Sequence, residues 1–162
     1  MRPKNLPKVL IFLFLAGLLM GQVARTQFSN PATSASTVPQ AQLMQPTELV
    51  RLLKGSGAEQ PVVFQVGSFV MFQQAHIPNA GFAGPGSQPN GIILLNKFAA
   101  PLKKNQFIVI YCGCCPWNRC PNIGPAYKQL RDLGFTNVKA LYLANNFGDD
   151  WVAKGYPTAR GE

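Results

Sequence analysis

Short apolar runs alternate with segments of helical periodicity between residues 43 and 160, and this alternation leaves few fold classes open. The runs 62–66, 107–111 and 138–143 are rich in β-branched residues and have the length of buried strands. Segments 46–54, 125–133 and 151–154 place apolar residues at helical spacing. Strands separated by helices predict a single α/β domain, with a central, mostly parallel sheet and helices on both faces.

Two further segments of this region are less clearly patterned. Residues 67–91 are rich in glycine and proline, which predicts a loop region. The run 92–95 (IILL) fits either a strand or a turn of helix. These segments leave the number of strands open.

The amino terminus has the pattern of a secretory signal peptide. Residues 1–8 carry three positive charges and no acid, and residues 9–20 are all apolar. That run is shorter than the ~20 apolar residues of a transmembrane helix. We expect a signal peptide over 1–24, a flexible linker over 25–42, and export to the periplasm or the exterior. A buried helix is one alternative, and an uncleaved membrane anchor is the other.

The net charge of +9 is distributed unfavourably for nucleic-acid binding. Four of the 15 Lys and Arg residues lie in the first 25 residues, and the others are scattered apart from the pair Lys103-Lys104. No basic stripe with interleaved aromatic residues is present. We therefore expect no nucleic-acid partner.

All four cysteines lie within nine residues, directly after the strand 107–111. They are Cys112, Cys114, Cys115 and Cys120. In open α/β sheets, ligands and chemistry are found at the carboxyl ends of the strands. Loop N–H groups, the start of the next helix and Arg119 would each favour a thiolate there. The position predicts that Cys112 is a reactive, deprotonated thiol.

The four cysteines have two alternatives to a reactive role: they could be purely structural, or they could bind a metal. Disulfides within the loop would close only small rings and add little stability. Partial pairing stays open and would make the site redox-sensitive, with Cys115 and Cys120 as candidate resolving thiols. Adjacent cysteines crowd a tetrahedral metal site, and the single histidine, His76, lies in another segment. We expect no metal and no other cofactor, with a non-catalytic thiol module that binds a metal or a partner protein as the alternative.

Four motifs, in order, resemble a rhodanese-homology domain over roughly residues 43–160. The first motif is the family's H-I-P-x-A, and the last is its closing W-x-x-x-G-Y-P. Between them come a strand that ends at a cysteine, and then a helix with the turn that follows it. In this chain the motifs are His76–Ala80, Ile108–Cys112, Leu130–Val138 and Trp151–Thr158.

The resemblance implies a sulfurtransferase. Its catalytic cysteine would take sulfane sulfur from a small-molecule donor as a persulfide and pass it to a thiophilic acceptor or a protein thiol. By position this cysteine is Cys112, and His76 is expected to be structural. The loop whose N–H groups would cradle the persulfide consists of Gly113, Cys114, Cys115, Pro116, Trp117, Asn118 and Arg119.

The chain also departs from the family pattern. Gln65-Val66-Gly67 stands where the family commonly has Asp-Val-Arg. Arg119 lies seven residues after Cys112 and five after Cys114, so Cys114 is the alternative nucleophile. Residues 112–115 also form a C-x-x-C that resembles thioredoxin-like redox proteins. Too few residues follow Pro157 for the strands that such a fold still needs.

Overall fold

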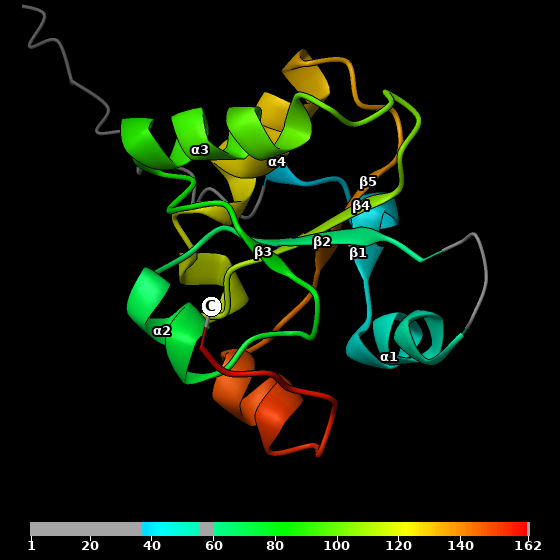
Figure 1. Ribbon diagram of the computed structural model, residues 1–162. Coiled ribbons are helices and arrows are strands. Elements are labelled where there is room, and N and C mark those ends of the chain that lie inside the picture. The colour runs from blue at the N-terminus through cyan, green and yellow to red at the C-terminus, as the bar shows by residue number, and fades with distance from the viewer. Residues whose placement is uncertain (1–36, 56–59, 162) are drawn as a thin grey trace, which may run out of the picture. The chain divides into compact units, whose positions relative to one another are not determined.

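The computed structural model describes residues 37–55 and 60–161, and these residues form a five-stranded, all-parallel sheet in the order β1-β5-β4-β2-β3 (Figure 1). The predicted parallel α/β architecture is therefore confirmed. The signal peptide predicted over 1–24 and the linker up to residue 36 lie outside the described residues. The strands are β1 (Leu43–Met44), β2 (Val62–Gln65), β3 (Gly81–Phe82), β4 (Ile108–Tyr111) and β5 (Val138–Leu141).

Helices cover both faces of the sheet, as the sequence predicts. In Figure 1, α3 and α4 lie on one face, and α1, α2 and the turn η4 lie on the other. Across residues 37–55 and 60–161, no helix has both the length and the apolar character needed to cross a bilayer. The helical elements are η2 (Gln40–Gln42), α1 (Pro46–Lys54), α2 (Phe69–Gln74), α3 (Pro89–Ala99), η3 (Trp117–Arg119), α4 (Ile123–Asp132) and the single π-helical turn η4 (Gly148–Val152).

The central strand β4 is buried along its whole length. Ile108 and Ile110 pack in the core under α3 and α4, whereas Val109 and Tyr111 pack in the core on the opposite face. A parallel strand covered on both faces reads as a continuous apolar run, which is why β4 is so clear in the sequence. The same burial brings the residue that follows, Cys112, into the interior.

The predicted loop over 67–91 is wrong in part, because it contains α2 and β3. Helix α2 forms because Phe72 packs into the core at 4% exposure. Strand β3 is only two residues long and pairs with β2 through Phe64 and Gly81, so it carries no periodic signal. The ambiguous run 92–95 lies within α3, which begins at Pro89 and buries Leu95.

The folded domain begins before the predicted boundary at Leu43. Val38 is 7% exposed and belongs to the core between the sheet and α3 and α4. The turn η2 then leads into β1, which pairs with β5. Residues 37–42 are thus part of the domain and not of the linker.

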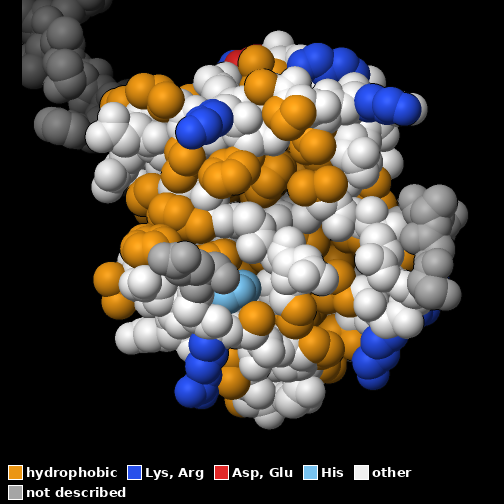
Figure 2. Space-filling view, viewed as in Figure 1, with side chains coloured by type: hydrophobic (Ala, Val, Ile, Leu, Met, Phe, Trp, Pro, Cys, Tyr) orange, Lys and Arg blue, Asp and Glu red, His pale blue; other side chains and the backbone are white. Residues whose placement is uncertain are grey.

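Figure 2 shows hydrophobic side chains gathered over α3 and between α3 and α2. Ile93 and Phe98 on α3 are 65% and 42% exposed, and Phe69 and Val70 on α2 are also exposed. On the same face, Lys and Arg side chains lie apart from one another and form no stripe.

Candidate functional site

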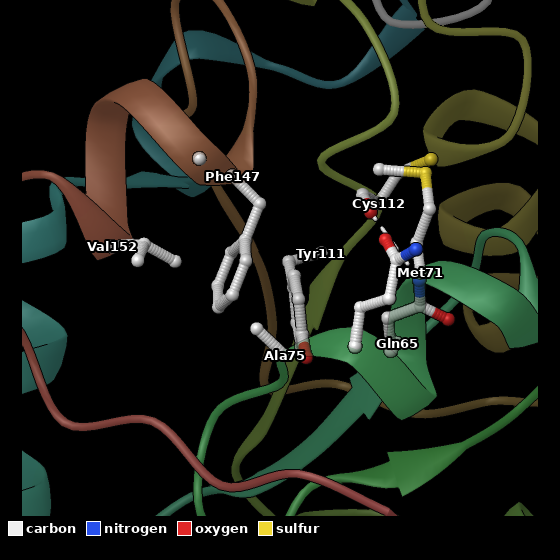
Figure 3. A pocket seen from close by; sticks show the side chains of 9 residues that line it. Gln65, Met71, Ala75, Tyr111, Cys112, Phe147 and Val152 are labelled. Carbon is white, nitrogen blue, oxygen red and sulfur yellow. Dashed lines mark hydrogen bonds between the residues drawn. The ribbon is translucent and has the colours of Figure 1, made fainter.

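Cys112 lies at the base of a cavity at the carboxyl end of the sheet. It directly follows β4, between the ends of β2 and β5. The side chain is only 3% exposed, but it lines a cavity of about 180 Å³. Figure 3 shows Tyr111, Phe147 and Val152 beside this space, with Gln65, Met71 and Cys112 grouped next to them. The lining residues are Gln65, Met71, Gln74, Ala75, Tyr111, Cys112, Phe147, Gly148 and Val152.

The cavity is uncharged. None of the described residues that line it is Lys, Arg, His, Asp or Glu. Burial raises the pKa of Tyr111 far above its usual range, so this phenol stays neutral.

Gln65 and Gly67 position Cys112 and explain one departure from the family pattern. The Gln65 Nε2 donates to the Cys112 carbonyl at 3.4 Å (Figure 3). The Gln65 Oε1 accepts from the Gly67 N–H at 3.1 Å. A Cβ at Gly67 would stand 3.0 Å from the Cys112 Sγ. An arginine at position 67 would therefore collide with the sulfur.

Gly113 directs the loop away from the strand. Its φ of +75° suits glycine, and a Cβ there would lie 2.5 Å from the Cβ of Phe147. The Gly113 carbonyl accepts from the Phe147 N–H at 3.0 Å. These contacts fix the loop against the segment that enters η4.

Three sulfur atoms meet beside the cavity. The Sγ atoms of Cys112 and Cys114 are 3.2 Å apart, and those two and the Cys120 Sγ all lie within 4.8 Å of one another. The Cys115 Sγ lies 2.8 Å from the Cys114 Sγ. The structure thus brings together the two candidate nucleophiles and both candidate resolving thiols.

The negative charge of this cluster rests on Cys120. Hydrogen bonds from the Cys112 and Cys114 thiols, and from the N–H groups of Asn122 and Ile123, lower the Cys120 pKa to about 3 despite its burial. The positive end of α4 therefore does stabilise a thiolate, as the sequence suggests.

The prediction that Cys112 itself is the thiolate is wrong. A hydrogen bond from Cys114 lowers its pKa, but the bond to Cys120 and burial outweigh that effect and raise the pKa to about 12. Cys112 is therefore a neutral thiol at rest, beside an anionic sulfur.

The loop after Cys112 only partly fits the predicted cradle. The N–H groups of Trp117, Arg119 and Cys120 donate to the carbonyls of Ala144, Pro116 and Trp117, respectively. These three amides are therefore not directed at a group on Cys112. The Arg119 side chain is exposed, as are Pro116 and Asn118.

Asn122 is a site residue that sequence reasoning missed. It is 7% exposed, and its Nδ2 donates to the Cys112 Sγ at 3.2 Å. Its Oδ1 accepts from the Ser87 hydroxyl at 2.7 Å and from the Ser87 N–H at 3.1 Å. Asn directly before a helix is usually a cap, but this side chain makes no cap hydrogen bond. Only the folded path of the chain shows that it reaches Cys112 instead.

His76 has the structural surroundings expected of it. Its Nδ1 lies 2.8 Å from the Phe72 carbonyl, and the two rings stack with centroids 4.0 Å apart. The next residue, Ile77, donates its N–H to the Tyr111 hydroxyl at 3.1 Å. The first family motif therefore supports the cavity wall and does not enter the cavity.

The closing motif also supports this wall. Trp151 is fully buried, and its Nε1 donates to the Pro157 carbonyl at 2.9 Å. Its ring stacks on Phe147, which in turn stacks on Tyr111. The aromatic residues thus connect the carboxyl-terminal segment to the residue before Cys112.

The same three sulfurs could hold a soft metal ion. The Sγ atoms of Cys112, Cys114 and Cys120 are close enough to share one ion, and thiolates select Zn²⁺ or Cu⁺. Two kinds of chemistry, sulfur exchange and soft-metal binding, are therefore compatible with the donor set.

Comparison with solved structures identifies the class of fold. No protein-family model matches the chain, and no match was found among curated proteins. The chain is similar to the crystal structure of the Alr3790 protein from Anabaena sp., with 21% identity, coverage of 72% of this chain and 82% of that chain, and a TM-score of 0.56. The solution structure of the rhodanese-like domain of Alr3790 is 23% identical, with coverage of 74% and 79% and a TM-score of 0.55.

The protein therefore has a rhodanese-like fold, with a cysteine-rich loop at the carboxyl end of the central strand. This confirms the resemblance drawn from the four motifs at the level of the fold. An all-parallel sheet with β4 at its centre also disfavours the thioredoxin-like alternative, in which further strands must follow the proline.

Proposed function

We propose that this protein is a sulfurtransferase that carries sulfane sulfur as a persulfide on Cys112. The main support is that Cys112 lines a cavity of about 180 Å³, while its Sγ lies 3.2 Å from the Asn122 Nδ2. The cavity gives a small donor access to an otherwise buried sulfur. The amide can donate a hydrogen bond to the thiolate and to the persulfide that replaces it.

The neighbouring thiolate supplies the base. A thiol must lose its proton to attack sulfur, and Cys112 is neutral at rest. Cys120 carries the charge in the same cluster, so moving one proton from Cys112 to Cys120 creates the nucleophile without adding a charge to the interior. The sulfurs of the cluster share one negative charge, and this charge shifts to Cys112 when a donor binds.

The uncharged lining of the cavity favours a low-molecular-weight organic persulfide over thiosulfate as donor. The Cys112 thiolate attacks the outer sulfur of R–S–SH, forms Cys112–S–SH, and releases R–S⁻, which takes a proton to become R–SH. A thiophilic acceptor or a protein thiol then receives the sulfur. We place this reaction after export, on the basis of the amino-terminal pattern.

The test is the rate of sulfur transfer from an organic persulfide to an external thiol. Wild type is expected to accelerate the transfer, and Cys112→Ser is expected to fall to the uncatalysed rate while keeping the wild-type circular dichroism spectrum. If Cys114→Ser loses the activity and Cys112→Ser keeps it, the nucleophile is Cys114 and the assignment is wrong.

Soft-metal binding is the competing function, and the three adjacent sulfurs favour it. Metal analysis of the protein isolated without chelators separates the two. A stoichiometric zinc or copper ion that blocks persulfide formation would support the binding function and contradict the transferase.

A further inference from the structure

We infer that the persulfide on Cys112 is resolved within the protein: the Cys120 sulfur attacks Cys112, forms a disulfide with it, and releases the transferred sulfur as hydrosulfide. This inference rests on the proposed function. It names the first acceptor of the sulfur as a thiol of the same chain, so the protein becomes a sulfide-releasing enzyme that needs re-reduction.

The geometry that carries this inference is the position of Cys112 between two cavities. The donor cavity of about 180 Å³ has no other cysteine among the described residues that line it. A second cavity, of about 10 Å³, is lined by Cys112 together with Cys115 and Cys120. Cys112 therefore borders both the cavity that we assign to the donor, called the donor side, and the small cavity lined by other cysteines, called the thiol side.

Thiol exchange at the Cys112 sulfur requires one side for the attacking sulfur and another for the leaving sulfur. A thiolate attacks a sulfur atom along the line of the bond that breaks, so the attacking and leaving sulfurs stand on opposite sides of the central one. A donor that enters the large cavity leaves the outer sulfur of Cys112–S–SH in that cavity. Cys120 lines the small cavity, on the side from which an attack expels this outer sulfur.

The thiol side has no room for an external acceptor. A volume of about 10 Å³ holds at most one water molecule. Its other walls include the apolar residues Ile123, Leu141 and Leu143. The Sγ atoms of Cys112 and Cys120 already lie within 4.8 Å of each other.

Cys120 is better suited to the attack than Cys114, although the Cys114 Sγ lies only 3.2 Å from the Cys112 Sγ. Cys120 lines the small cavity together with Cys112, whereas Cys114 does not. A disulfide to Cys114 would also have to close across Gly113, whose backbone is fixed by Phe147.

The step balances without an added oxidant. The proton that Cys120 took from Cys112 passes to the leaving R–S⁻, which gives R–SH and restores the Cys120 thiolate beside Cys112–S–SH. The new S–S bond forms between Cys112 and Cys120 as the bond to the outer sulfur breaks, and HS⁻ leaves. The two cysteines are oxidised to a disulfide, and the sulfane sulfur is reduced to sulfide.

The test is a single turnover of the fully reduced full-length protein with one equivalent of an organic persulfide, without oxygen or added thiol. About one sulfide per chain is expected above the Cys112→Ser background, with loss of two thiols. Trypsin should then yield peptide 105–119 linked by a disulfide to peptide 120–128.

The cysteine variants identify the resolving thiol. Cys120→Ser and Cys120→Ala lack the base and are expected to take up sulfur more slowly. They are expected to keep it as a persulfide, a gain of about 32 Da removed by dithiothreitol, and to release at least about tenfold less sulfide per sulfur taken up. Cys114→Ser is expected to release sulfide and to form the same cross-link. Circular dichroism confirms that each variant is folded.

Two outcomes would overturn the inference. One is a wild-type protein that keeps its persulfide and releases no sulfide. The other is sulfide release that stops in Cys114→Ser but continues in Cys120→Ser. If no variant and no wild-type sample takes up sulfur, the proposed function itself fails, and the resolution step fails with it.

Discussion

At the scale of single residues, the site depends on one neutral sulfur held beside one charged sulfur. A buried charge is costly unless it is hydrogen-bonded, and Cys120 collects such bonds from neighbouring thiols and from backbone amides at the start of α4. Cys112 gains access to a donor without being charged at rest. The sequence alone did not reveal this division of roles, because spacing along the chain does not show which sulfurs the fold brings together.

Gly67→Ala tests how tightly the Cys112 sulfur is packed. The added methyl would lie 3.0 Å from the Cys112 Sγ and 3.2 Å from its carbonyl oxygen. We expect a loss of about 1–3 kcal/mol in the free energy of unfolding and slower sulfur uptake. Gly55→Ala is the control, since its nearest neighbour is at 3.4 Å. Equal stability of the two variants in urea titrations would show that the Cys112 side chain is not confined by Gly67.

The charge on Cys120 predicts how stability depends on pH. Its pKa falls from 9.0 to about 3 on folding, so its contribution is complete above pH 9 and is lost as the pH falls toward 3. Cys112 has its pKa raised to about 12 and keeps its proton in both states below pH 8. Between pH 5 and 8.5, the free energy of unfolding of the reduced wild type should rise relative to Cys120→Ser, by at most about 1.4 kcal/mol per pH unit.

Denaturant titrations of both proteins, with a reductant present, measure this difference. Parallel curves for wild type and Cys120→Ser across the whole range would mean that Cys120 is not the charged sulfur.

At the scale of elements, the strands and most of the helices could be predicted from periodicity, but the contacts between them could not. The run that forms β4 and the helix α4 are visible because one is continuously apolar and the other has a helical apolar face. Helix α2 is six residues long and β3 only two, too short for either period to show. Helix α2 supplies Met71 and Gln74 to the cavity that Cys112 lines.

Helix α2 offers a test of the uncharged cavity. Gln74 lines the cavity and is exposed, so Gln74→Arg adds a cation at its edge. We expect this variant to use thiosulfate about 3- to 10-fold better than wild type, with a smaller change for an organic persulfide. The matched control is Gln73→Arg, on the same helix at an exposed residue that does not line the cavity. An equal gain in both variants would show that general charge, and not the cavity, selects the donor.

At the scale of the whole domain, the motifs predicted the fold because the first and the last support the same cavity wall, while Leu130, Phe135 and Val138 of the third pack on the other face of the sheet. His76 fixes the end of α2, Ile77 contacts Tyr111, and Trp151 fastens the carboxyl-terminal segment. The start of the domain was predicted too late because residues 37–42 have the composition of a linker. In that stretch Val38 is buried, while Thr37, Pro39, Gln40 and Ala41 stay exposed, and composition cannot show where one valine packs.

Trp151→Ala is expected to destabilise the whole domain. The ring is fully buried, stacks on Phe147, meets Tyr156 edge to face, and donates to the Pro157 carbonyl. The loss in the free energy of unfolding should be about 3–5 kcal/mol, while Val152→Ala, at a 42% exposed neighbour, should cost less than about 1 kcal/mol. Thermal melts of the two variants that coincide would contradict the role of the closing motif.

Locating the added sulfur tests the role of Cys112 most directly. Reduced Cys120→Ser protein is treated with an organic persulfide, alkylated within seconds and digested with trypsin, and peptide 105–119 is sequenced by tandem mass spectrometry. We predict one additional sulfur, about 32 Da, between Cys112 and its alkyl group. A sulfur found only on Cys114 or Cys115, or no added sulfur in a folded protein, would contradict Cys112 as the sulfur carrier.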